Sequence, residues 1–129
     1  MRGPPSASTS ATGARAEDAA LRFLVARGLR LVARNFRCGG GEIDLVMLEG
    51  QTLVVVEVRY RCNQRLVDPA LTVTAAKRRR LLHAAASFLQ RHPAHAARAL
   101  RFDVMALSGG PDAPACRWIR RAFDGNDTS

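Results

Sequence analysis

The stretch Leu53-Val54-Val55-Val56-Glu57-Val58-Arg59-Tyr60 is the most apolar run in the chain. It predicts a β-strand, because β-branched side chains pack well on a pleated surface. A carboxylate, that of Glu57, lies in the middle of this run. A buried carboxylate without a partner costs several kcal/mol of stability. Glu57 is therefore expected to reach solvent, to be protonated, to pair with a cation or to bind a metal ion.

The composition indicates one domain with a hydrophobic core. The chain has 129 residues, of which 47% are hydrophobic, enough for one domain and few for two. No run approaches the roughly 20 apolar residues of a membrane span, and the N-terminal region lacks the apolar segment of a signal peptide. Three cysteines far apart in the sequence favour reduced thiols over disulfides or a zinc site. A cytoplasmic protein without membrane contact is expected.

The charge of the chain favours a polyanionic partner. Twenty Lys and Arg against eleven Asp and Glu give a formal net charge of +9. Lys77 is the only lysine, and a GC-rich coding sequence explains such an arginine bias as well as phosphate recognition does. Aromatic residues, at 5%, are too few for a single-strand binder built on base stacking. Backbone contact with duplex or branched DNA fits better.

The pattern along the chain predicts the element order αβββαββ. Residues 1–12, rich in Ser, Thr, Ala, Pro and Gly, are expected to form a disordered tail, as are residues 124–129, on either side of a domain at 13–123. The predicted helices are residues 13–27 and a segment after an N-cap at Thr74, and the predicted strands are residues 29–37, 42–48, 53–60, 100–107 and 117–123. Strands on both sides of a long crossover helix predict an α/β fold with a mixed sheet flanked by helices.

A hairpin sets the register of the two central strands. Glu49-Gly50-Gln51-Thr52 predicts a two-residue loop of type II′, with the glycine first. Pairing outward from this loop places Asp44 opposite Glu57 and Glu42 opposite Arg59. Directly opposed residues of an antiparallel pair project to the same face, with Cβ atoms about 5 Å apart.

Two facing carboxylates in an apolar hairpin repel each other. A divalent cation such as Mg²⁺ would offset both charges, since it prefers oxygen ligands. The alternative, equally open at this point, is that this face of the hairpin opens to solvent and Asp44 pairs with one of the many arginines.

A basic run, Lys77-Arg78-Arg79-Arg80, lies in the first turns of the second predicted helix. Such a run ordinarily forms a solvated face. If the helix lies beside the hairpin, the same side chains are candidates for binding phosphates.

An ordered series of motifs resembles a known family. The motifs are Gly41-Glu42-Ile43-Asp44-Leu45-Val46, Val55-Val56-Glu57-Val58-Arg59-Tyr60-Arg61, Lys77, Arg101-Phe102-Asp103-Val104 and Arg121-Ala122-Phe123. Over residues 13–123 the chain resembles the uncharacterised bacterial YraN family, which is similar to the Holliday junction resolvase branch of the PD-(D/E)xK nucleases. The resemblance implies a restriction-endonuclease-like fold, with a three-layer arrangement of helices and a central mixed sheet.

The resemblance also implies roles for individual residues. Asp44 and Glu57 match the motif carboxylates that hold Mg²⁺ or Mn²⁺, and Glu17 matches an additional helix carboxylate. Without the resemblance, Glu17 is explained by the macrodipole at a helix start. Arg59 replaces the motif lysine, keeping its charge but unable to act as a general base. Lys77 is a candidate to supply the missing ammonium group from the neighbouring helix.

The leading hypothesis is a metal-dependent endonuclease that hydrolyses phosphodiester bonds of DNA, branched DNA included. The main alternative is a nucleic-acid-binding protein that retains the nuclease fold without turnover, which the arginine at position 59 favours. A weaker alternative is a scaffold whose basic surface binds an acidic protein. In the first two hypotheses Arg78, Arg79 and Arg80 contact nucleic acid, and a homodimer is a further expectation.

Overall fold

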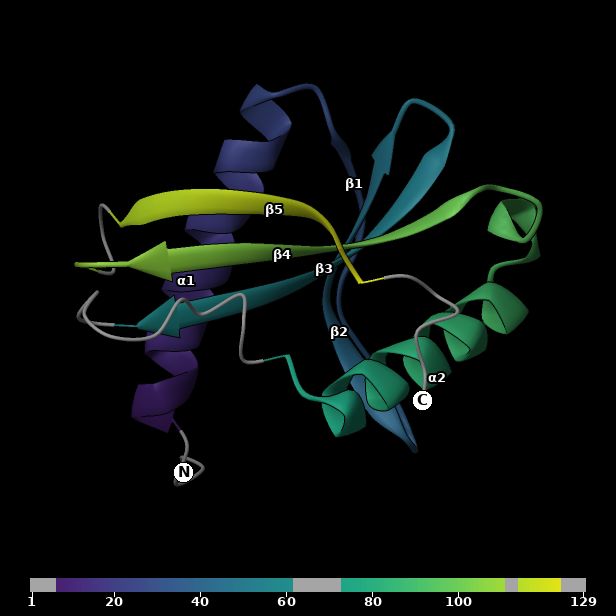
Figure 1. Cartoon of the computed structure of the whole chain (residues 1–129), viewed down its shortest axis with the longest axis horizontal. Coiled ribbons are helices and arrows are strands. Elements are labelled where there is room, and N and C mark those ends of the chain that lie inside the picture. Colours follow the sequence, from purple (N-terminus) through teal and green to yellow (C-terminus); the bar gives the residue numbers. More distant parts are fainter. Residues whose placement is uncertain (1–6, 62–72, 111–113, 124–129) are drawn as a thin grey trace.

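The computed structural model describes residues 7–61, 73–110 and 114–123. The elements are α1 (Ala7–Ala26), β1 (Arg30–Cys38), β2 (Gly41–Glu49), β3 (Thr52–Arg61), α2 (Ala75–Arg91), the 3₁₀ helix η2 (Pro93–His95), β4 (Leu100–Ser108) and β5 (Ala115–Phe123) (Figure 1). The predicted order αβββαββ is confirmed, with one short 3₁₀ helix added after α2. Thr74 is the N-cap of α2, because its hydroxyl accepts from the amide of Lys77 at 3.1 Å.

The first helix begins earlier than predicted. It starts at Ala7 instead of residue 13, so residues 7–12 are helical where a disordered tail was expected. Alanine, at two of these six positions, favours helix, whereas the prediction gave more weight to their serine and threonine. The rest of that tail and the tail at 124–129 lie outside the described residues.

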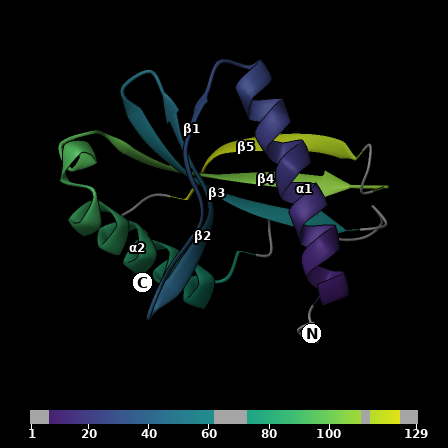
Figure 2. The same ribbon diagram turned by 180° about the vertical axis from the view of Figure 1, so that it is seen from behind.

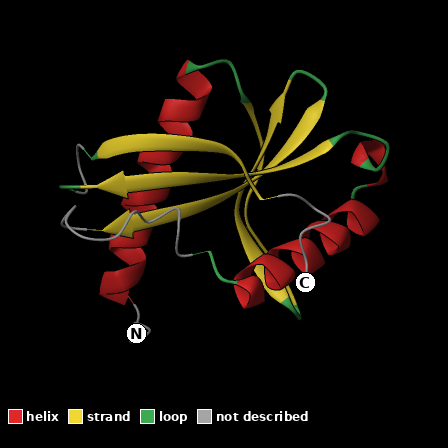
Figure 3. Cartoon of the chain, viewed as in Figure 1, coloured by secondary structure: helices red, strands yellow, loops and turns green. Residues whose placement is uncertain are grey.

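The five strands form one mixed sheet in the order β1-β2-β3-β4-β5 (Figure 3). The central pair β3 and β4 is parallel and is connected through α2, whereas the other three pairs are antiparallel. The predicted register of β2 and β3 is confirmed from Glu49↔Thr52 to Leu45↔Val56. Gly50 has a φ of 60°, and Gln51 is not among the residues with positive φ, as a type II′ loop requires.

The two helices cover opposite faces of the sheet. The helix α1 packs on one face, over a cluster that includes Leu45, Val56 and Met105, and Figure 2 shows it on the side turned away from α2. The helix α2 packs on the other face against β1 and β2, over a cluster that includes Val46, Val55 and Phe88. The central strands β2 and β3 contribute alternate residues to the two clusters, which explains why they are apolar almost throughout.

A buried ionic cluster joins β4 to its neighbours. Asp103, 1% exposed, accepts from Arg101 Nε at 2.9 Å, from Arg101 Nη2 at 3.0 Å, from Trp118 Nε1 at 2.8 Å and from the amide of Arg121 at 3.0 Å. Arg101 also donates to Glu49 at 2.7 Å, near the tip of the hairpin. The motif Arg101-Phe102-Asp103 therefore holds the sheet together, and its carboxylate is fully occupied by these donors.

Within the part of the chain that the structure describes, neither α1 nor α2 has the combination of length and hydrophobicity that a membrane-spanning helix needs.

Candidate functional site

The strands β2 and β3 separate at Asp44. Their pairing ends at Leu45↔Val56, whereas the pairing of β2 with β1 continues to Gly41. Figure 1 shows this end of β2 turned toward α2 and away from β3. The side chain of Asp44 bridges the opening, because its Oδ2 accepts from the amide of Val58 at 2.8 Å. The separation leaves space between the two strands at the level of the predicted carboxylate pair.

This separation makes one predicted pair wrong. Glu42 was expected to face Arg59 across the hairpin. Instead, Glu42 lies 3.7 Å from Arg37 of β1, and Arg59 lies 3.5 Å from Glu57 on its own strand. Because β2 has left β3 by this level, the register that holds for the inner pairs no longer brings the outer pair together.

The carboxylate of Glu57 is buried and faces two cations. Its side chain is 6% exposed, and its Oε2 lies 3.1 Å from Lys77 Nζ and 3.5 Å from Arg59 Nη1. Lys77 comes from the first turns of α2, so the crossover helix delivers the single lysine of the sequence to the strand carboxylate. Pairing with cations, one of the four outcomes expected for a carboxylate in this apolar strand, is observed.

Asp44 is held in an environment that disfavours its charge. Burial, followed by the nearby charge of Glu57, raises its pKa to about 7, against the opposing effect of the hydrogen bond from Val58. The charges of Glu17 and Glu42 add smaller contributions in the same direction. The repulsion expected between the two facing carboxylates is therefore present, and proton uptake by Asp44 relieves it in this state.

Glu17 lies within electrostatic reach of Asp44 but has partners of its own. Its Oε1 lies 3.6 Å from Arg34 Nη2, and its side chain also bonds to Asn35. Burial raises the pKa of Glu17, and these partners oppose the rise. Within residues 7–61, 73–110 and 114–123, no group of three or more His, Cys, Asp or Glu is arranged to hold a metal ion. The structure thus brings Asp44 and Glu57 to one cavity and within electrostatic reach of each other, and the three-carboxylate site stays a prediction.

A cavity of about 330 Å³ opens above these carboxylates, between β2, β3 and the start of α2. Its charged lining consists of Glu42, Asp44, Glu57, Arg37, Lys77 and Arg80. Gly41 allows α2 to approach, since a Cβ at this position would lie 2.5 Å from the backbone oxygen of Arg80. The sequence analysis did not predict that Arg37 and Cys38 line this cavity. The available signal was Gly41, which opens the motif of Asp44 and marks a close approach of two backbones.

The basic run of α2 divides into three environments. Lys77, which faces Glu57, and Arg80 both line the cavity. Arg78 donates to the carbonyl of Val73 at 3.0 Å and so closes the start of the helix. Arg79 is exposed to solvent. The run is therefore not one uniform surface.

Comparison with known proteins places the chain in a family. Residues 16–107 match the model of the uncharacterised protein family UPF0102. The chain belongs to the UPF0102 family. It is 47% identical over 121 residues to a UPF0102 protein of Pseudomonas entomophila, covering 93% of this chain and 98% of the relative. It is 52% identical over 124 residues to a UPF0102 protein of Ralstonia nicotianae, covering 93% of this chain and 90% of the relative.

This assignment confirms the predicted YraN resemblance, because UPF0102 is that family. A UPF0102 protein of Methylococcus capsulatus is similar over 113 residues, with 48% identity, covering 88% of this chain and 90% of the relative. The UPF0102 match includes Glu17, Asp44, Glu57 and Lys77 and ends before β5. The names of these UPF0102 relatives state no activity, so function has to be argued from the site.

Proposed function

We propose that this UPF0102 protein is a divalent-metal-dependent endonuclease that hydrolyses phosphodiester bonds of DNA, branched DNA included. The observation that carries the proposal is the carboxylate pair at the opening between β2 and β3, with a lysine beside it. Asp44 has a pKa of about 7 next to Glu57, and Lys77 Nζ lies 3.1 Å from the Glu57 carboxylate. Perturbed carboxylates that line a cavity with cations are typical of catalytic sites.

The donor set fits Mg²⁺ or Mn²⁺. Asp44 and Glu57 present hard oxygen donors in a confined position, and a divalent charge there would offset the repulsion that raises the pKa of Asp44. Glu17 is the candidate for a third protein ligand, after release from Arg34. When bound, such an ion lowers the pKa of its water and stabilises negative charge on phosphate oxygens.

The cationic side chains have separate roles in this proposal. Lys77 stabilises the charge that develops on the scissile phosphate, since its ammonium group already lies against Glu57. Arg59 contributes fixed positive charge beside the same carboxylate and cannot act as a proton acceptor, because a guanidinium group stays protonated in proteins. Arg80, on the wall of the cavity, holds the phosphate in place.

The fold supports the same proposal. A mixed sheet that carries one carboxylate on β2 and the next on β3, with a helix on each face, is the arrangement that a restriction-endonuclease-like domain implies. Fold alone does not determine activity, so the weight rests on the site.

Cleavage assays test the proposal directly. Purified protein with Mn²⁺ is incubated with linear, flap and four-way DNA, and cleavage of at least one geometry is expected. Asp44→Asn should abolish cleavage, whereas Asp18→Asn should retain it, because Asp18 is half exposed and pairs at the surface with Arg34. Cleavage that survives Asp44→Asn would assign the activity to another site or to a contaminant.

A second candidate is nucleic-acid binding without turnover. Lys77 and Arg59 together neutralise Glu57 with no metal ion required, and Arg59 stands where the nuclease motif has lysine. Under this candidate the wild type binds DNA but cleaves none of the geometries, with Mg²⁺ or with Mn²⁺.

A further inference from the structure

A row of three residues crosses the sheet beside the candidate site. Arg59 of β3 pairs with Ala106 of β4, and Ala106 pairs with Arg117 of β5. Paired residues on neighbouring strands project to the same face of the sheet. Arg59 and Arg117 therefore lie on one face, with a small alanine between them.

The alternation of side chains identifies this face. Val58, Tyr60, Cys116 and Trp118 all pack against the cluster under α1. Glu57, Arg59 and Arg117 alternate with these residues, so they project to the opposite face.

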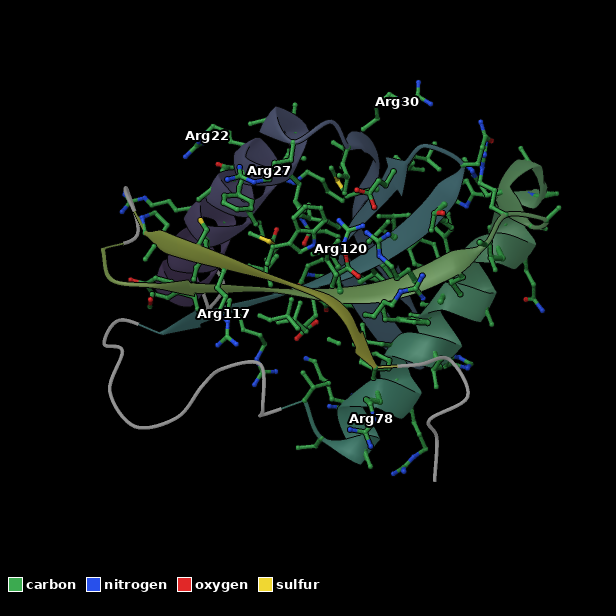
Figure 4. All side chains as sticks on the ribbon, turned by 45° about the horizontal axis from the view of Figure 1, so that its top comes forward. Arg22, Arg27, Arg30, Arg78, Arg117 and Arg120 are labelled. Carbon is green, nitrogen blue, oxygen red and sulfur yellow. The ribbon has the colours of Figure 1, made fainter. Side chains whose placement is uncertain are left out.

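Figure 4 agrees with this assignment, since Arg117 points away from β5 on the side opposite Arg22 and Arg27. Arg117 thus shares the face of the sheet that carries Glu57.

A second arginine of β5 lies at a different place. Arg120 donates to Glu49 at 2.8 and 3.1 Å, and its guanidinium lies 4.6 Å from the centre of the Trp118 ring. These contacts hold Arg120 near the tip of the hairpin, whereas Arg117 lies in the row that begins at Arg59, on the face of Glu57. Of these two arginines, Arg117 is the one in position to meet a ligand that also reaches Glu57 and Arg59.

The spacing suits a nucleic-acid backbone. Arg59 and Arg117 are two strands apart, which corresponds to about 10 Å across the sheet. Neighbouring phosphates of one DNA strand lie farther apart than the axial rise of about 3.4 Å per nucleotide, because the backbone winds around the axis, so this distance corresponds to about one or two nucleotides. A guanidinium group binds phosphate oxygens through two parallel N–H donors.

We infer that Arg117 is a substrate-binding residue that contacts a backbone phosphate about one or two nucleotides from the phosphate bound beside Arg59. The inference rests on the proposed function and extends it, because it directs the bound strand from the site across β4 to β5. No residue of β5 was assigned to nucleic acid by the sequence.

The test measures DNA binding in metal-free buffer over a range of salt concentrations, by fluorescence anisotropy. Arg117→Gln should weaken binding about tenfold at low salt. It should also lower the slope of log K against log salt by about 0.9, the value for one phosphate that is no longer bound. Arg117→Lys should restore the slope. Arg22→Gln, which removes the same charge from α1 on the other side of the sheet, should leave affinity and slope nearly unchanged.

Neutral methylphosphonate linkages, placed singly along one strand, locate the phosphate that Arg117 binds. Wild-type binding should be sensitive at two positions about one or two nucleotides apart. Arg117→Gln should remove the sensitivity at one of them and Arg59→Gln at the other. A variant that has already lost its contact with a phosphate loses no further affinity when that phosphate is made neutral. Wild-type DNA binding with an unchanged slope in Arg117→Gln overturns the inference and leaves the proposed function intact. Failure of the wild type to bind any DNA overturns both.

Discussion

The carboxylate of Asp44 accepts a hydrogen bond from the backbone amide of Val58, at 2.8 Å, at the level where β2 leaves β3. Because β2 no longer pairs with β3 at this level, the amide of Val58 has no backbone acceptor on β2, and the side chain of Asp44 accepts its hydrogen bond instead. The same separation of strands that ends the ladder makes room for the cavity lined by Glu57 and Lys77. The carboxylate of Asp44 therefore both satisfies the backbone where the strands separate and lines the candidate site.

Asp44→Asn should stabilise the metal-free protein in a pH-dependent way. The folded pKa of Asp44, about 7, lies above its ordinary value of 3.8, so the native state binds more protons than the unfolded state between these values. Wild-type stability should then fall as pH rises from about 4 to about 7, by at most about 4 kcal/mol. Urea denaturation across pH values from about 5 to about 8 measures the difference between the two proteins. The advantage of Asp44→Asn should grow to about pH 7 and then level off, and a constant difference would contradict the assignment.

Mn²⁺ or Mg²⁺ should raise the melting temperature of the wild type. Binding to the folded state alone stabilises by mass action, by about 2.7 kcal/mol at a hundredfold excess over Kd. Asp44→Asn should lose this response, and Asp18→Asn should keep it. Differential scanning fluorimetry with a metal titration provides the measurement. A wild type indifferent to both ions would remove the metal site from the proposal.

Lys77 and Arg59 should both contribute to catalysis. If the wild type cleaves DNA, Lys77→Met and Arg59→Ala should each lower turnover by about 100-fold or more, since each removes a positive charge beside the site. Arg59→Lys should retain or raise activity, because it restores the motif lysine. If the wild type is silent and Arg59→Lys cleaves in Mn²⁺, turnover was lost through this substitution. Silence of both proteins, with bound metal confirmed, favours binding without turnover.

The basic run of α2 should separate into DNA-binding and structural positions. Arg79→Gln with Arg80→Gln should lower DNA affinity and reduce the salt slope, by up to about 0.9 for each phosphate that the variant no longer binds. Arg78→Gln should affect stability more than the slope, because Arg78 bonds to the carbonyl of Val73 at the start of the helix. Anisotropy and thermal melts of the same proteins compare the two effects. A reduction of slope by Arg78→Gln as large as that per arginine in the double variant would restore the uniform basic surface expected from the sequence.

Asp103→Ala should destabilise the fold strongly. It leaves Arg101, Trp118 and the amide of Arg121 without their buried acceptor, a change that costs about 3 to 5 kcal/mol in comparable ion pairs. Trp118→Phe, which removes one donor and keeps an aromatic ring, should cost about 1 to 3 kcal/mol. Equilibrium denaturation measures both. A small effect of Asp103→Ala would mean that the cluster relaxes toward water.

The sequence by itself determined the order of elements and the inner register of the hairpin. Period-two apolar runs and the loop at Gly50 are local features, and local backbone preferences produce the strands and the turn between them. The motif around Asp44 and Glu57 was likewise readable, because a carboxylate in an apolar strand demands a partner. Its contact with Lys77 was not readable from the pattern of the strand, since Lys77 belongs to a helix distant in the chain.

Only the tertiary structure decided those partners. The crossover helix brings Lys77 from α2 to Glu57, and the separation of β2 from β3 turns Glu42 to Arg37 and leaves Arg59 with Glu57. The row that ends at Arg117 likewise depends on β4 pairing with both β3 and β5. Such contacts arise from packing between elements, and the energy of packing is not encoded in any single stretch of sequence.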